Sequence, residues 1–122
     1  MSREFKFRVY SFVCKEFIYF DIYDYPQGIA GGVSEPQQFT GLTDANDNPI
    51  CEGDILIQNF IKSGSIPVTG VIGQVIYEVD QGAYIFQWKR NGPNQHHTNL
   101  NCDVAFESVI VGNIFENPEL LN

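Results

Sequence analysis

The segments GVIGQVIYEV at residues 70–79, DQG at 80–82 and AYIFQWK at 83–89 decide the fold class of this chain. A period-two pattern in the first segment predicts a long strand. The second segment predicts a tight turn into another strand. Gly73 predicts a bulge or a sharp bend inside the long strand. Together these features are typical of a small, strongly bent antiparallel barrel.

Two further strands are predicted near the start of the chain. At residues 3–10, apolar side chains alternate with charged ones, which predicts a half-buried strand. Arg8 falls on its charged side, which we expect to face solvent. The aromatic-rich segment at residues 16–23 predicts a central strand buried on both faces. A hairpin around residues 11–15 would join the two strands.

The rest of the chain predicts short extended segments separated by turns. Extended segments are expected at residues 38–42, 55–60 and 108–115. Turns or loops are expected at residues 24–36, 43–49, 62–70 and 90–101. Asn117 as an N-cap, followed by Pro118, predicts a short helical turn near the C-terminus.

These elements predict a mainly β fold with almost no helix. We expect a strongly bent antiparallel sheet with a small barrel-like part and a short C-terminal helical turn. Residues 1–122 are predicted to form a single domain. A subdivision into N-terminal strands at 1–42 and a barrel-like part at 50–122 stays open.

Composition supports one packed domain and argues against disorder. Hydrophobic residues make up 43% of the 122 residues, and aromatic side chains are plentiful. The formal net charge is −8, which disfavours binding to duplex nucleic acid. The charge is uneven, because residues 17–122 hold three cations against 13 acids, a balance of −10. The basic N-terminal segment either lies across this acidic body or forms a cationic solvent face, and we favour the second.

The cysteines and the N-terminal segment give information on the cellular compartment of the protein. The three cysteines are Cys14, Cys51 and Cys102, and none lies in a CxxC motif. The first residues lack the apolar core of a secretory signal, and no apolar run approaches the roughly 18 residues that span a bilayer. We therefore expect free thiols, no contact with membranes, and a cytoplasmic protein.

An acidic segment is the first candidate for chemistry. Four acids fall within eleven residues, namely Asp44, Asp47, Glu52 and Asp54. The spacing of oxygen ligands resembles a calcium loop, but Pro49 and Ile55 stand where that loop needs glycine and glutamate. We therefore predict that these side chains bond to the backbone of a turn.

A second candidate is the pair His96–His97 with Cys102. Adjacent residues of an extended chain point to opposite faces, so one metal ion cannot easily use both histidines. We expect exposed loop histidines. Glycine-rich nucleotide-binding motifs are absent. The sequence therefore predicts no catalytic, cofactor-binding or metal-ligating residues.

Aromatic side chains admit two interpretations. Tyr77, Tyr84, Phe86 and Trp88 could stack on single-stranded nucleic acid, but we favour core packing because few cations lie nearby. Phe115, with the two leucines near the C-terminus, could dock on another subunit or back on the sheet, and we favour the sheet.

Three blocks of sequence form one pattern along the chain, namely REFKFR at residues 3–8, QFTGLTDANDNPICEGDI at 38–55 and VGNIFENPELL at 111–121. In this order they resemble the YopX family, small proteins encoded largely by phages and prophages. Two departures stand out: Asp47 to Pro49 replaces a glycine turn, and Cys51 replaces a common aromatic. The resemblance implies a mainly β fold with a bent sheet. It carries over no activity and no catalytic residues.

We therefore expect a non-enzymatic phage accessory protein that binds a host or phage protein and self-associates. The loops at 24–36 and 90–101 are candidates for its binding surface. One alternative is an acidic inhibitor that imitates nucleic acid. A second alternative is a small metal-dependent hydrolase, which would need Asp44, Asp54 and His96 or His97 to converge in one pocket.

Overall fold

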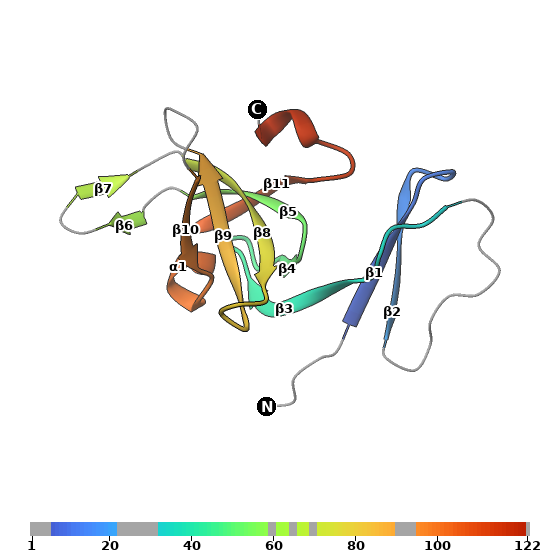
Figure 1. Ribbon diagram of the computed structural model, residues 1–122, viewed down its shortest axis with the longest axis horizontal. Coiled ribbons are helices and arrows are strands. Elements are labelled where there is room, and N and C mark those ends of the chain that lie inside the picture. Colours follow the sequence, from blue (N-terminus) through green and yellow to red (C-terminus); the bar gives the residue numbers. More distant parts are fainter. Residues whose placement is uncertain are drawn as a thin grey trace.

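The computed structural model describes residues 6–21, 32–58, 61–63, 66–68, 71–89 and 95–121. The predicted features at residues 3–5, 24–31 and 90–94 lie outside these ranges. Two antiparallel sheets, one small hairpin and two short helical segments make up the described part (Figure 1). The prediction of a mainly β fold is confirmed.

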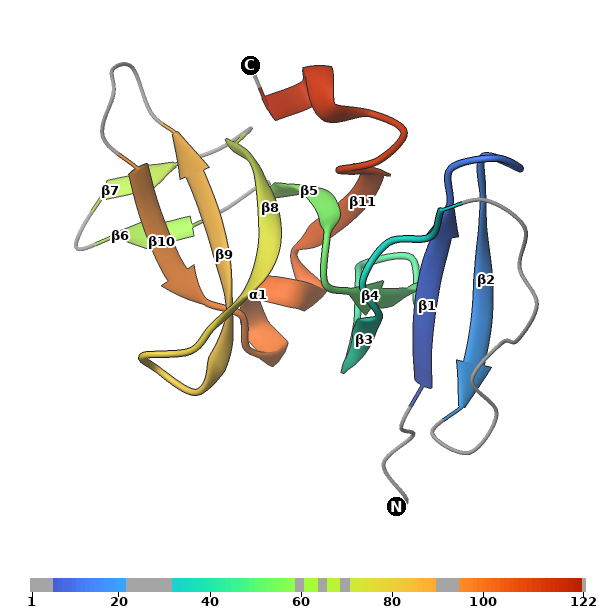
Figure 2. The same ribbon diagram turned by 45° about the vertical axis from the view of Figure 1, so that its right-hand side comes forward.

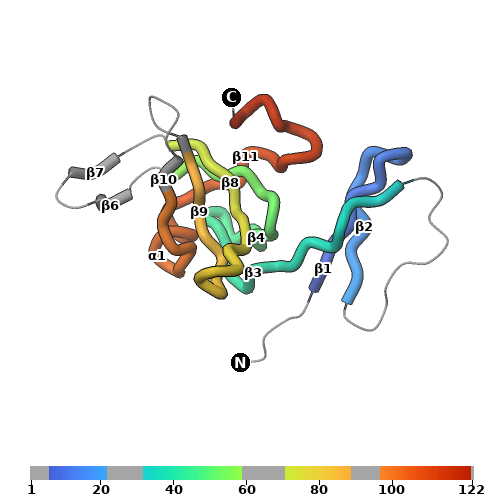
Figure 3. The backbone as a smooth tube through the Cα atoms, in the orientation of Figure 1, coloured from blue at the N-terminus to red at the C-terminus, as the bar shows by residue number. Residues whose placement is uncertain are grey.

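The first sheet has four strands in the order β2-β1-β3-β4. Their bounds are β1 Lys6–Ser11, β2 Glu16–Asp21, β3 Gln37–Thr43 and β4 Pro49–Cys51. Strands β1 and β2 pair along their whole length, from Lys6 opposite Asp21 to Ser11 opposite Glu16. This confirms the predicted hairpin around residues 11–15. In Figure 3, β3 leads from this hairpin to the body formed by the second sheet.

The second sheet has five strands in the order β10-β9-β8-β5-β11 (Figure 2). Their bounds are β5 Asp54–Gln58, β8 Val71–Glu78, β9 Ala83–Lys89, β10 Gln95–Asn99 and β11 Ser108–Asn113. The hairpin of β8 and β9 is the one that residues 70–89 predict. The predicted C-terminal turn is the 3-10 helix η1, Pro118–Leu121. In the described part, the strands form bent sheets and do not close into a barrel.

Gly73 allows two strands to approach closely. A Cβ atom at this position would lie 2.3 Å from the backbone oxygen of Gln87 on β9. The pairing of β8 with both neighbours keeps its register through Gly73, so the predicted bulge is absent there. The register shift in this sheet lies instead in β11, between Ile110 and Gly112.

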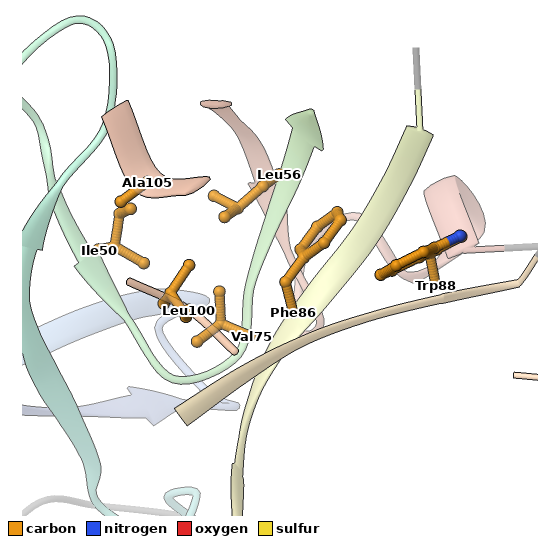
Figure 4. Packing of buried hydrophobic residues seen from close by; sticks show 7 residues of the cluster. All are labelled: Ile50, Leu56, Val75, Phe86, Trp88, Leu100 and Ala105. Carbon is orange, nitrogen blue, oxygen red and sulfur yellow. The ribbon is translucent and has the colours of Figure 1, made fainter. Parts of the chain in front are cut away.

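The main core is formed by side chains of the second sheet together with side chains of β4, of the helix α1 (Cys102–Phe106) and of the segment between β10 and α1. Figure 4 shows its seven buried side chains, Ile50, Leu56, Val75, Phe86, Trp88, Leu100 and Ala105. Phe86 is fully buried and stacks on Trp88 with ring centroids 5.5 Å apart. Core packing is therefore confirmed for these two aromatics. Tyr84 packs at the edge of the core, and Tyr77 is 47% exposed.

Strand β2 is an edge strand, so the prediction of a central strand is wrong. It pairs only with β1 in the described part of the chain. Tyr19 is 60% exposed, whereas Phe17 and Phe20 are half-buried. The aromatic side chains of β2 do not require a strand on each side, because they contact rings of the same hairpin.

Two predicted loops contain strands, and one short helix was not predicted. Residues 62–70 include part of a hairpin of β6 Ile61–Ser63 and β7 Ile66–Val68. Residues 90–101 include β10, whose polar residues can pair at a sheet edge because the ladder bonds come from the backbone. The helix α1, Cys102–Phe106, was not predicted. Its signal was Asn101, whose side chain accepts a hydrogen bond from the Val104 amide.

Candidate functional site

Arg8 is buried, and the prediction that it faces solvent is wrong. Only 5% of this residue is exposed. Its Nη2 donates to Asp54 Oδ1 at 2.8 Å and to the backbone oxygen of Glu52 at 3.1 Å. Its Nε donates to Gln37 Oε1 at 2.9 Å. The basic N-terminal strand thus lies against acids of the body at this point.

Asp54 completes a closed polar cluster around the arginine. Its Oδ2 accepts a hydrogen bond from the Cys51 amide at 2.8 Å. Burial raises the pKa of the Asp54 carboxyl, while the charge and hydrogen bonds of Arg8 oppose that change. The Phe17 ring lies 4.1 Å from Arg8 Cζ. Since both partners of the ion pair are satisfied, we assign this cluster to joining β1 and β5.

Asp44 shapes the acidic turn from inside. Its Oδ1 accepts hydrogen bonds from the amides of Asn46 and Asn48, both at 2.9 Å. Its Oδ2 accepts from the amide of Ile110 at 3.0 Å. Burial alone would raise the pKa of Asp44, but these backbone donors outweigh it and the pKa is lowered. The predicted bonding to a turn backbone is confirmed for this carboxylate.

Asp47 has a backbone conformation that is more usual for glycine. Its φ is 65°, in the left-handed region that glycine enters at no steric cost. Gly53, at the second turn of the motif, has a φ of 82°. A Cβ there would lie 2.2 Å from Nε2 of Gln37, the residue that holds Arg8. The motif therefore combines two tight turns with the arginine cluster.

The structure does not bring the predicted metal candidates together. Asp44 and Asp54 are buried and bonded as described, whereas His97 is exposed on β10 and its Nε2 lies 3.3 Å from Gln81 Nε2. The backbone of His96 lies opposite Trp88, and its side chain is outside the described part. Cys102 is exposed at the start of α1. Within the described ranges, no three His, Cys, Asp or Glu side chains could hold a metal ion.

An aromatic surface covers one side of the N-terminal hairpin, and we call it the hairpin face. It consists of rings that contact one another, namely Tyr10, Phe12, Phe17, Tyr19, Phe39 and Phe115. We include Val13, the exposed neighbour of Phe12 in the turn between β1 and β2. Phe115 stacks on Tyr10 with ring centroids 5.0 Å apart, which confirms the predicted docking of this residue on the sheet. Phe12, Val13 and Tyr19 are 52%, 61% and 60% exposed.

A groove of about 600 Å³ opens beside the β8–β9 hairpin, and we call it the Glu52 groove. Its lining comes from four separate parts of the chain and consists of Gln38, Glu52, Tyr77, Gly82, Ala83, Tyr84, Asn99 and Leu100. Tyr84 Oη donates to Gln38 Oε1 at 3.1 Å, and the Gln38 amide donates to Glu52 Oε1 at 3.0 Å. Sequence patterns missed this site because its residues are far apart in the sequence, and the Tyr84–Gln38 hydrogen bond alone joins residues 46 positions apart.

In the described part of the chain, no helix has both the length and the apolar character to cross a membrane.

Comparisons with known proteins agree with this fold. The family model described as YopX protein matches residues 33–122. The crystal structure of protein EF1440 from Enterococcus faecalis is similar over 99% of this chain and 100% of that one. The TM-score is 0.61 and the sequence identity is 23%, so this likeness shows the fold alone. The search of curated proteins found no match.

Proposed function

Because the chain belongs to the YopX protein family, we propose that it is a phage or prophage accessory protein that acts by binding another protein. In this proposal it has no enzymatic activity. Its partner is a host or phage protein, and it also associates with copies of itself. It acts in the bacterial cytoplasm, where the free thiols of Cys14 and Cys102 would stay reduced.

The observation that carries the proposal is the exposure of the hairpin face. Three of its apolar side chains, Phe12, Val13 and Tyr19, are each more than half exposed. Phe12 and Val13 lie in the turn between β1 and the edge strand β2, and Tyr19 lies on β2 itself. Aromatic residues at the centre of a contact contribute much of the binding energy of protein interfaces. An exposed edge strand also offers backbone groups for pairing with a partner.

Two acidic residues of the family motif support the same proposal, because their side chains are used to hold the fold together. Asp44 and Asp54 use both carboxylate oxygens to hold backbone amides or Arg8. Their burial also removes them from the acidic surface that a nucleic-acid mimic would present. Binding through the hairpin face therefore has the more direct support.

Capture of partners by a tagged protein tests the proposal. The double substitution Val13→Ser and Tyr19→Ser removes two exposed side chains of the hairpin face. We expect it to weaken capture from host lysate, or self-association measured by sedimentation, by at least about tenfold. The matched control is Val79→Ser, because Val79 is 80% exposed in a turn of the other sheet. Thermal unfolding checks that each variant folds.

A monodisperse monomer at high concentration that captures no specific protein would overturn the proposal. Equal loss of binding in the Val79→Ser control would also contradict it, because the hairpin face would then have no special role.

A further inference from the structure

The Glu52 groove has a carboxylate with unused hydrogen-bonding capacity. Glu52 is half-buried, and its Oε1 accepts a hydrogen bond from the Gln38 amide. Among the described residues, nothing donates to its other oxygen, Oε2. Arg8 donates to the backbone oxygen of Glu52, and its ion pair is with Asp54. The groove therefore presents an oriented negative charge to an incoming ligand.

Two tyrosine rings form the wall of the same groove. Tyr77 and Tyr84 meet at an interplanar angle of 70°, with ring centroids 5.3 Å apart. The hydrogen bond from Tyr84 Oη to Gln38 fixes one ring, while Tyr77 is 47% exposed at the rim. Aromatic faces attract cations through the ring quadrupole. A carboxylate beside two such rings selects a cationic group over a neutral one.

The shape and charge of this site favour a guanidinium group. A guanidinium is planar, stacks on aromatic rings and donates in a fork that matches a carboxylate. Asn99 also lines the groove, and its side chain carries a further hydrogen-bond acceptor. The net charge of −8 attracts a basic partner over a longer range.

We propose that the Glu52 groove binds an arginine side chain of the protein partner. The guanidinium stacks against the tyrosine wall and donates to Oε2 of Glu52. This inference rests on the proposed function, since it assigns one contact of the protein partner. It adds a charged contact to the apolar contact that the hairpin face provides.

Titration of the isotope-labelled full chain with two small probes tests the proposal by NMR. N-acetyl-arginine N-methylamide carries the cation, and N-acetyl-citrulline N-methylamide is its neutral near-isostere. We expect saturable shifts of the Gln38, Glu52 and Tyr84 amides with the arginine probe. With the citrulline probe we expect binding at least about fivefold weaker. The matching lysine probe shows how much a point charge alone contributes.

Two variants locate the binding at the groove. Glu52→Gln keeps an oxygen to accept from the Gln38 amide but removes the charge, and we expect about five- to tenfold weaker binding. Tyr77→Leu removes the exposed ring and should weaken binding about threefold or more. Glu16→Gln is the matched control, because Glu16 is exposed on the other sheet and lies outside this groove.

Equal affinity for the arginine and citrulline probes overturns the inference, and so does unchanged affinity in Glu52→Gln. Shifts centred on residues outside the groove overturn it as well. These results are separable from the fate of the proposed function. If Val13→Ser with Tyr19→Ser abolishes partner capture while Glu52→Gln has no effect, the arginine site is wrong. The proposal that the hairpin face binds a protein partner is then still supported.

Discussion

Arg8 Nη2 lies 2.8 Å from Asp54 Oδ1, and this contact joins two strands that are 46 residues apart in sequence. Both side chains are almost completely buried. The pair links the first sheet, through β1, to the second sheet, through β5. It is a buried polar connection between the N-terminal hairpin and the start of β5.

Removing the arginine should be strongly destabilising. Arg8→Met leaves a buried carboxylate without its cation, and we expect a loss of about 3–5 kcal/mol in the free energy of unfolding. Adding Asp54→Asn should recover about 1–3 kcal/mol, because the uncompensated charge is gone. Urea unfolding measures both. The control Lys6→Met, at an exposed position of β1, should change stability by less than about 0.5 kcal/mol. Additive effects of the two substitutions would contradict direct coupling.

Asp44 should make stability depend on pH at the acidic end. Its pKa is lowered in the folded protein by three backbone donors, so the unfolded state binds the proton more readily. The stabilisation is therefore present above the unfolded pKa of about 3.9 and is lost as pH falls below it.

Urea unfolding between pH 2.5 and 7 tests this dependence. Asp44→Ala should lower stability at pH 7 by about 2–4 kcal/mol, because three amides lose their acceptor. It should also flatten the acidic limb of the stability profile. Asp80→Asn, at an exposed turn position, should leave that limb in place. An unchanged limb in Asp44→Ala would show that other groups cause the acid sensitivity.

Asp47→Gly should stabilise the protein by about 0.5–1 kcal/mol. The residue has a φ of 65°, and an L side chain in this region carries a steric cost that glycine avoids. Asp47→Ala should instead be destabilising, because alanine keeps the Cβ and loses the polar group that tolerates this conformation. Thermal unfolding compares the two. A stabilising alanine would contradict the argument from backbone strain.

Gly53→Ala should lower the free energy of unfolding more than Gly82→Ala does. Both glycines have a positive φ, but a Cβ at Gly53 would collide with Gln37, whereas a Cβ at Gly82 meets nothing within 4 Å. We expect about 1 kcal/mol for Gly82→Ala, and at least about 2 kcal/mol for Gly53→Ala. Urea unfolding measures the difference. Equal losses would mean that Gln37 moves away without weakening its hold on Arg8.

The three thiols should differ in reactivity. Burial raises the pKa of Cys51 to about 12, and this side chain is 2% exposed, whereas Cys14 and Cys102 are exposed. A thiol reagent at pH 8 should modify two cysteines quickly and the third only as the protein unfolds. Mass mapping identifies the slow one. Rapid modification of Cys51 in folded protein would contradict its burial.

Sequence patterns predicted most strands because alternation depends only on local residues. The hairpin of β8 and β9 followed from residues 70–89, and the turn around Asp44 followed from its Asp and Asn content. The alternation of apolar and charged residues assigns each side chain to one face of a strand, but it does not show which other segments cover that face. Arg8 was therefore assigned to solvent, although its face meets Asp54.

Other differences arise because local patterns do not contain the position of a segment in the folded chain. Strand β10 is polar because it lies at a sheet edge, where backbone pairing is enough, and its composition therefore resembled a loop. The Glu52 groove could not be predicted at all. Its two tyrosines and its carboxylate meet only after β8, β9 and the turn between β4 and β5 have come together.

Arg8 lies outside the stretch at residues 33–122 that matches the family model, yet its hydrogen-bonding partners Gln37, Glu52 and Asp54 lie within it. A fragment that begins at residue 33 would therefore be an incomplete folding unit, with a buried carboxylate in need of a counter-ion. The N-terminal hairpin acts toward it as a tethered ligand. A synthetic peptide spanning residues 6–21, added in trans, should restore the missing guanidinium and rescue the fragment.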